Sequence, residues 1–268
     1  MTVTPAPRLI VTDMDGTLLD GQRQLPAHFP AIVRGLAARG IGWAIASGRQ
    51  LANLQAQFAE LGLALDIIAE NGALALLGGA REPFFEDLTP VDFFAEVIAT
   101  ARCVPGATPV LCGATCAWVD DAYPANFEAV GHYFSRSEHL PLDPLPPVRL
   151  CKVAIYHPDA GGVLWQRLAP LARADLRVIH SSPCWIDVQP ARINKGRALA
   201  ALLQRRGLQP AEAVVFGDYL NDTEMMTLGT HAVAMANAHP ELLALCPHHA
   251  PANTENGVVR YLRALGVL

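Results

Sequence analysis

The sequence predicts an α/β fold, in which a parallel β-sheet is covered by helices on both faces and a second α/β domain is inserted into the first. Short apolar segments alternate along the chain with segments of helical periodicity. These segments are apolar throughout, as expected for strands that are buried on both faces. The middle of the chain has a different composition, because it holds most of the aromatic residues and a proline-rich run at 141–147.

Five strands are expected in the parallel sheet, and helices are expected between them where apolar residues recur three or four positions apart. Right-handed crossovers bring the carboxyl ends of such strands to one edge of the sheet, where folds of this type bind their ligands. The expected helices include Phe29, Leu51 and Leu199. The expected strands are Leu9–Thr12, Gly42–Ala46, Asp66–Ala69, Ala213–Phe216 and Ala232–Met235.

The change in composition divides the chain into three segments. Residues 1–83 and 189–268 form the two parts of the core domain, and residues 84–188 form the inserted α/β domain. Within the insert we expect a helix over 91–101 and strands at Leu150–Tyr156 and Trp185–Val188.

Composition limits the classes of function. Of 268 residues, 51% are apolar and 17% are charged, so a large core is expected. The net charge of −5 and the absence of a Lys/Arg run argue against nucleic-acid and membrane partners. No apolar stretch reaches the roughly 20 residues of a membrane span, and Met1–Arg8 has no signal-peptide layout. We expect a cytoplasmic protein that is a monomer or a weak homo-oligomer, with reduced cysteines.

Two carboxylates follow the first expected strand. In an extended chain, Asp13 and Asp15 would project to the same side and share one small space. Their like charges would then need a cation or a shared proton. Solvated turn residues are the alternative interpretation of this pair.

Two further segments could bind an anion. Ser47 and Gly48 stand between a strand and a helix, where a hydroxyl and backbone N–H groups can cradle a phosphate. Lys195 lies in the first turn of a helix, a mildly unfavourable place for a cation unless an anion lies in front of it. An ordinary serine cap and a solvated lysine are the simpler alternatives.

A second acidic loop follows the strand at 213–216. Asp218 ends an apolar strand and therefore needs a partner, while Asn221 and Asp222 precede the next helix. Asp222 could simply cap that helix. Oxygen ligands without nearby His or Cys suit Mg²⁺. Four carboxylates, balanced by Lys195 and one Mg²⁺, would keep a net charge of −1 before a phosphate dianion enters.

Taken in their order along the chain, these segments resemble those of the haloacid dehalogenase-like (HAD) phosphatases. The resemblance is closer to the Cof-type group of this family, subfamily IIB. The resemblance covers nearly the whole chain, with Ser47 standing where many members have threonine. It implies a Rossmann-like core with an inserted cap domain. The matching segments are Asp13–Leu18, Ser47–Arg49, Lys195–Gly196 and Gly217–Asp222, supported by Glu70–Gly72, Met235–Ala238 and Asn256–Val258.

The resemblance also implies roles for these residues. Asp13 would be the nucleophile that becomes an aspartyl-phosphate, and Asp15 the general acid and then base. Mg²⁺ would be held by the Asp13 carboxylate, the Asp15 backbone carbonyl and Asp218, with Asp222 behind them. The phosphate would be held by Ser47, Gly48, Lys195 and Asn221.

The substrate implied is a small phosphorylated metabolite, a sugar phosphate first and pyridoxal or flavin phosphate second. Two alternatives remain. A phosphosugar mutase on the same core would return the phosphoryl group to a sugar instead of to water. A non-enzymatic Mg²⁺ and phosphoacceptor module is the other, although a receiver domain of that kind is about half this length.

Overall fold

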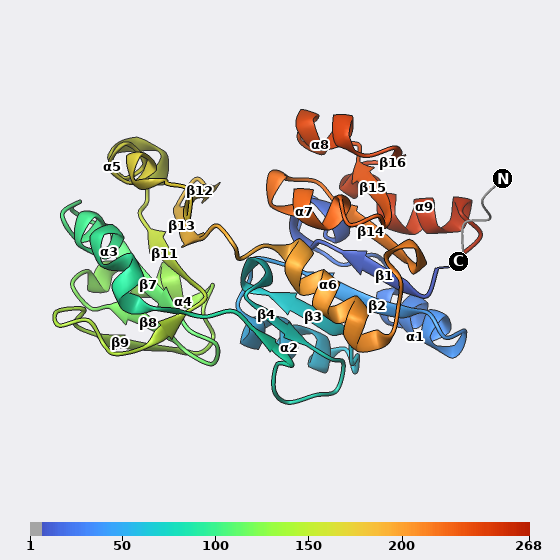
Figure 1. Cartoon of the computed structure of the whole chain (residues 1–268), viewed down its shortest axis with the longest axis horizontal. Coiled ribbons are helices and arrows are strands. Elements are labelled where there is room, and N and C mark those ends of the chain that lie inside the picture. Colours follow the sequence, from blue (N-terminus) through green and yellow to red (C-terminus); the bar gives the residue numbers. More distant parts are fainter. Residues whose placement is uncertain (1–6) are drawn as a thin grey trace. The chain divides into compact units, whose positions relative to one another are not determined.

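The computed structural model describes residues 7–268, so the first six residues of the predicted range 1–83 lie outside the description. The chain divides into two compact units, whose elements are labelled in Figure 1. The first unit comprises the described residues up to Gly48, together with Leu54–Phe85 and Asn194–Leu268. The second comprises Glu86–Ile193 and the short segment Arg49–Asn53.

The first unit is built on an eight-stranded sheet of order β16-β15-β14-β1-β2-β3-β4-β5. Its first six strands in this order are parallel, and β4 joins β3 in the antiparallel sense. The chain builds outward from β1 in both directions, so β1 and its neighbour β14 lie at the topological switch point. The strands are β1 (Leu9–Thr12), β2 (Gly42–Ala46), β3 (Asp66–Ala69), β4 (Leu74–Leu76), β5 (Phe85–Glu86), β14 (Ala213–Gly217), β15 (His231–Met235) and β16 (His248–Ala250).

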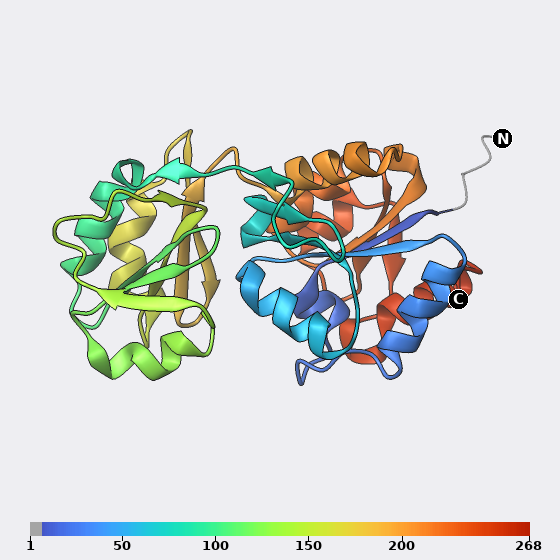
Figure 2. The same ribbon diagram turned by 90° about the horizontal axis from the view of Figure 1, so that it is seen from below.

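Helices cover both faces of this sheet (Figure 2). On one face, buried residues of α6, α7 and α8 form a single core with strand residues such as Val11 and Val215. On the other face, Phe29 of α1 packs edge-on against Trp43 with ring centroids 5.1 Å apart. The helices are α1 (Phe29–Ala38), α2 (Leu51–Glu60), α6 (Lys195–Arg206), α7 (Thr223–Met226), α8 (Pro240–Leu245) and α9 (Gly257–Ala264).

The predicted α/β class with a largely parallel sheet is confirmed. Three of the five expected strands have the predicted bounds, β14 extends one residue further to Gly217, and β15 begins one residue earlier at His231. Apolar runs located these strands well because both faces of each strand are buried.

The second unit contains a mostly antiparallel sheet of order β12-β13-β11-β7-β8-β9. Its strands are β7 (Thr108–Cys112), β8 (Ala117–Asp120), β9 (Ser137–Leu140), β11 (Lys152–Tyr156), β12 (Leu176–Ser182) and β13 (Trp185–Pro190). Helices α3 (Ala95–Arg102) and α5 (Trp165–Leu168) share one hydrophobic core with this sheet, and α4 (Phe127–Gly131) belongs to the same unit.

One expectation for this unit is confirmed and one needs correction. The predicted helix over 91–101 is present as a 3-10 turn at Val91–Phe94 that continues directly into α3. The predicted strand Leu150–Tyr156 is two strands in different sheets, because β10 (Arg149–Leu150) pairs with β6 (Thr89–Pro90) while β11 pairs with β7 and β13.

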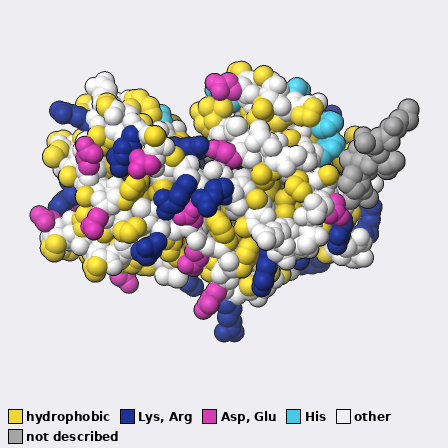
Figure 3. Space-filling view, viewed as in Figure 1, with side chains coloured by type: hydrophobic (Ala, Val, Ile, Leu, Met, Phe, Trp, Pro, Cys, Tyr) yellow, Lys and Arg dark blue, Asp and Glu magenta, His cyan; other side chains and the backbone are white. Residues whose placement is uncertain are grey.

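Charged groups are distributed unevenly between surface and interior. Acidic and basic side chains are interspersed over the face drawn in Figure 3. Inside the second unit, Lys152 and Asp187 form a buried ion pair, with Nζ and Oδ2 3.1 Å apart.

Within residues 7–268, no helix is both long and apolar enough to cross a membrane.

Candidate active site

The candidate residues lie at the carboxyl edge of the first unit's sheet. Asp13 follows β1, Ser47 follows β2, and Asp218 follows β14. Since β1 pairs with both β2 and β14 in parallel, the three strands end side by side. The fold therefore brings together residues that are more than 200 positions apart in the sequence.

Lys195 is the centre of this group. It is the first residue of α6, which Asn194 caps by accepting a hydrogen bond from the backbone N–H of Arg197 at 2.9 Å. The Lys195 ammonium donates to Oδ1 of Asp13 at 2.5 Å and to Oδ1 of Asp222 at 2.6 Å. Its side chain is fully buried. Two anions therefore lie in front of the cation that the helix dipole alone would disfavour.

Asp222 fixes the second acidic loop. Its Oδ2 accepts hydrogen bonds from the backbone N–H groups of Asp218 at 2.9 Å and Tyr219 at 3.1 Å, while its Oδ1 binds Lys195. The carboxylate lies so close to the strand that a Cβ on Gly217 would stand 2.6 Å from Oδ2. Asp222 thus couples the end of β14 to the start of α6, and a side chain at 217 would separate them.

Asp218 is held from the other side by the turn Met14–Leu18. The Thr17 hydroxyl donates to Oδ1 of Asp218 at 2.7 Å. Gly16 has φ of +82° and approaches so closely that a Cβ there would stand 2.2 Å from Oδ2 of Asp218. Glycine is needed here for both the backbone conformation and the space.

Three carboxylates form a group that could hold a metal ion. One oxygen from each of Asp13, Asp218 and Asp222 lies within 4.8 Å of the other two. In the described part of the chain, no hydrogen bond is donated to Oδ2 of Asp13 or to Oδ2 of Asp218. Lys195 offsets only one of the three negative charges. Hard oxygen ligands with uncompensated negative charge fit a divalent cation such as Mg²⁺.

The electrostatics of the group reflect this crowding. Burial raises the pKa of Asp13 well above its usual value, and the charges of Asp222 and Asp218 add to this effect, while Lys195 opposes it. Burial likewise raises the pKa of Asp218 to about 6. Burial alone would lower the pKa of Lys195, but the carboxylates of Asp13 and Asp222 outweigh it and raise that pKa. Lys195 therefore stays charged in the folded protein.

Asp15 does not join the three carboxylates. Both Asp13 and Asp15 lie beyond β1, which ends at Thr12, and the backbone is extended at each of them. The projection of their side chains into one space stays a prediction. Asp13 is buried, whereas Asp15 is exposed. Asp15 nevertheless acts on the group through its charge, which contributes to the raised pKa of Asp218.

Ser47 and Gly48 lie in the loop between β2 and α2, as expected. They are four and three residues before α2 begins at Leu51, so Ser47 does not cap that helix. The Ser47 backbone N–H donates to the carbonyl of Ile68 at 2.8 Å, and the side chain is almost fully buried. Asn221 donates from Nδ2 to Oδ1 of Asn71, with the two atoms 3.4 Å apart.

Three residues at this edge were not assigned a role from the sequence. Thr17 binds Asp218, and Asn71 contacts Asn221. Asn237 donates to the carbonyl of Gly16 at 2.8 Å and accepts from the backbone N–H of Asn253 at 3.0 Å, which ties the turn after β1 to the loop before α9. All three residues lie in segments that carried the family resemblance, which was the one available signal.

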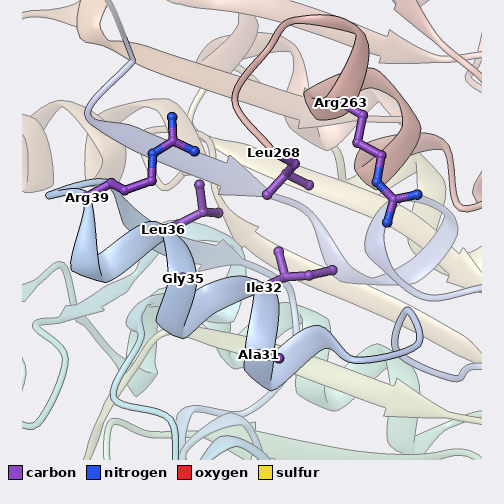
Figure 4. Close-up of a pocket in the computed structure, with 7 residues that line it drawn as sticks. All are labelled: Ala31, Ile32, Gly35, Leu36, Arg39, Arg263 and Leu268. Atoms are coloured by element: carbon purple, nitrogen blue, oxygen red, sulfur yellow. The ribbon is translucent and has the colours of Figure 1, made fainter.

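A separate pocket of about 300 Å³ lies between α1 and the C-terminal residues Arg263 and Leu268 (Figure 4). It shares no residue with the carboxylate group, and nothing in it resembles a catalytic arrangement. Its lining residues are Ala31, Ile32, Gly35, Leu36, Arg39, Arg263 and Leu268.

Comparison with known proteins agrees with this geometry. A sequence model of the haloacid dehalogenase-like hydrolase family matches residues 10–262, and the chain belongs to this family. The predicted resemblance to its Cof-type phosphatases is confirmed.

Two similar curated proteins are named phosphatases. HMP-PP phosphatase from Cronobacter sakazakii is 31% identical over 242 residues, which cover 90% of this chain and 88% of the relative. The 5-amino-6-(5-phospho-D-ribitylamino)uracil phosphatase from Escherichia coli is 29% identical over 256 residues, which cover 94% and 93% of the two chains. Among solved structures, SMU.1108c from Streptococcus mutans superposes with a TM-score of 0.82 at 25% identity, over 98% of this chain and all of the other. The chain is a phosphomonoesterase of the HAD family.

The raised pKa of Asp218 predicts a pH-dependent gain in stability for Asp218→Asn. The folded-state pKa of about 6 lies above the ordinary value of 3.8, so the favourable contribution of Asp218 is complete below pH 3.8 and is lost as the pH rises through 6. In EDTA, the variant should be more stable than the wild type at pH 7.5, by on the order of 1–2 kcal/mol. The gain should shrink toward pH 4.5. Urea denaturation at the two pH values measures both, and a less stable variant at pH 7.5 would contradict this account.

Removal of the central cation should destabilise the fold strongly. Lys195→Met leaves Asp13 and Asp222 buried without their shared ammonium, which should cost roughly 3–5 kcal/mol in EDTA at pH 7.5. Adding Asp13→Asn to this variant removes one of the two buried negative charges left without a cation and should recover part of the loss. Equal stability of the single and double variants would show that Lys195 does not offset the charge of Asp13.

Proposed function

We propose that the protein is a Mg²⁺-dependent phosphatase that hydrolyses a small phosphomonoester through an aspartyl-phosphate on Asp13. The observation that carries this proposal is the environment of Asp13. One of its oxygens is held by Lys195, while the other accepts no hydrogen bond from residues 7–268, and its carboxylate is grouped with those of Asp218 and Asp222. A hydrogen bond to one oxygen orients the carboxylate, and the other oxygen can then form a bond to phosphorus.

The first step transfers the phosphoryl group to the protein. An oxygen of Asp13 forms a bond to phosphorus, and the bond from phosphorus to the leaving oxygen breaks. Asp15, in its protonated form, gives its proton to that leaving oxygen. The exposure of Asp15 supports this role, because a leaving group and a water molecule can approach its carboxyl from solvent.

The second step releases phosphate. Asp15, now a carboxylate, takes a proton from water as the water oxygen forms a bond to phosphorus. The bond between phosphorus and Asp13 then breaks, and both aspartates return to their starting states. Asp15 thus serves as general acid and then as general base.

Charge stabilisation supplies most of the catalysis in phosphoryl transfer. The Ser47 hydroxyl, the backbone near Gly48, the Lys195 ammonium and the Asn221 carboxamide would hold the phosphoryl oxygens. The burial of Lys195 and Ser47 supports this assignment, because hydrogen bonds and charges act more strongly where water is excluded.

The metal would be held by the carboxylates of Asp13 and Asp218 and by the backbone carbonyl of Asp15. When bound, Mg²⁺ would offset the negative charge of the carboxylates and of the phosphoryl oxygens. Asp222 supports these ligands through its hydrogen bonds to Lys195 and to the backbone of Asp218.

We further propose that residues 84–188 are the cap domain of this enzyme, and that the substrate is a sugar phosphate or, second, pyridoxal or flavin phosphate. The Escherichia coli relative supports the inclusion of phosphorylated ribityl compounds among the candidates, by its name alone. The cytoplasmic location and the monomeric or weakly homo-oligomeric state stay predictions.

The nucleophile assignment is tested by Asp13→Asn. The amide cannot attack phosphorus, so release of p-nitrophenol from p-nitrophenyl phosphate should fall by about 10³-fold or more. The thermal midpoint should stay close to that of the wild type. Asp175→Asn, the same substitution at an exposed carboxylate of the second unit, is the matched control and should keep full activity. Turnover by Asp13→Asn above about a tenth of the wild-type rate would refute the assignment.

A panel of phosphorylated metabolites tests the reaction and the metal together. With Mg²⁺ present, at least one small phosphomonoester should release free phosphate at a rate well above that of p-nitrophenyl phosphate, and EDTA should abolish that release until Mg²⁺ is restored. Formation of an isomeric hexose phosphate without free phosphate would instead indicate the mutase. Full activity in EDTA would overturn the metal assignment.

A further inference from the structure

The turn after β3 has an unusual backbone. Three successive residues have positive φ, with +51° at Glu70, +55° at Asn71 and +97° at Gly72. Glycine adopts this region freely and asparagine tolerates it, but glutamate rarely does. A run of such residues persists only where the surrounding structure holds it in place, and such runs concentrate at functional sites.

The neighbours of this turn are the candidate active-site segments. A Cβ on Gly72 would stand 2.2 Å from the carbonyl oxygen of Asn194 and 2.8 Å from the backbone nitrogen of Lys195. The turn therefore lies directly against the start of α6, the helix that carries Lys195. A larger residue at 72 would displace the helix from this position.

Asn71 contacts two further segments. Its backbone N–H donates to the carbonyl of Ser47 at 3.0 Å. Its side chain lies against Gly48, where an added Cβ would stand only 2.7 Å from Oδ1 of Asn71. The same Oδ1 accepts the hydrogen bond from Nδ2 of Asn221 at 3.4 Å. One nearly buried residue thus touches the loop after β2 and the loop after β14.

We propose that Asn71 is a positioning residue, which sets the distance between the Ser47–Gly48 loop and Asn221 so that both can reach the same phosphate. This rests on the proposed function, which assigns those groups to phosphate binding. The residue type fits the task in three ways. Asparagine tolerates positive φ, its carbonyl oxygen accepts from Asn221, and its carboxamide is neutral beside a phosphate dianion.

The first test compares Asn71→Gly with a matched control. Glycine keeps the left-handed backbone and removes only the side chain. Asn256→Gly is the control, because Asn256 has the same φ of +55°, is exposed, and lies before α9. The readouts are KM and kcat for p-nitrophenyl phosphate, the inhibition constant of inorganic phosphate, and the thermal midpoint.

We expect Asn71→Gly to raise KM and the inhibition constant of phosphate by roughly 5- to 20-fold, because two phosphate-binding groups lose their shared support. Asn256→Gly should change neither. Asn71→Asp, which keeps the acceptor but adds a negative charge, should weaken phosphate binding further than Asn71→Gly. An inhibition constant within twofold of the wild type in Asn71→Gly would overturn the proposal, as would a lowered thermal midpoint with unchanged phosphate binding.

A second test uses Gly48→Ala in a double-mutant cycle. Gly48 does not have positive φ, so alanine fits its backbone, and the added Cβ would push the Asn71 carboxamide away. If Asn71 carries the effect, the double variant should bind phosphate no more weakly than Asn71→Gly alone. Losses that multiply in the double variant would show that the two residues act independently, against the proposal.

Failure of this proposal is distinguishable from failure of the proposed function. An active wild type, an inactive Asp13→Asn and an unchanged Asn71→Gly would overturn only the role of Asn71. A wild type with no activity above that of Asp13→Asn would overturn the function, and with it the basis for the role of Asn71.

Discussion

The ion triad of Lys195 with Asp13 and Asp222 is the interaction on which the rest of the active edge depends. It joins the end of β1, the start of α6 and the loop after β14, three segments that have no local reason to meet. A fully buried ammonium is tolerated only when its charge is matched and its hydrogen bonds are made. Here the two short hydrogen bonds to carboxylates meet that requirement and also orient Asp13.

The same triad leaves negative charge at the site that Lys195 alone does not offset. Lys195 compensates one negative charge, so Asp218 and one of its neighbours keep theirs in a largely buried place. Burial raises the pKa values of Asp13 and Asp218, and repulsion between the carboxylates adds to the rise. A divalent cation would relieve this repulsion, and a phosphate dianion without the cation would worsen it, so the proposed function requires the metal to bind before the substrate.

Much of this fold could be predicted from the sequence. Five of the six parallel strands are apolar runs, and burial on both faces makes such runs easy to recognise. The sixth, β16, contains two histidines and was not predicted. Strand pairing in the second unit could not be predicted, because nothing in the segment 149–156 indicates that its two halves pair with different partners. The burial of Lys195 was equally hidden, since its partners lie 182 and 27 positions away. The different exposure of Asp13 and Asp15 depends on where β1 ends and on the positive φ of Gly16, neither of which the D-x-D spacing determines.

The burial of Lys195 has a consequence for the outer surface. The chain contains only two lysines, Lys152 and Lys195, and both are buried in ion pairs. Every basic side chain that reaches solvent with a fixed positive charge is therefore an arginine, whose guanidinium stays protonated throughout the usable pH range. Reagents that acylate amines should find no accessible lysine on the folded protein. Alkaline buffers should likewise remove no side-chain positive charge from the surface, so lysine titration would contribute nothing to its electrophoretic mobility there.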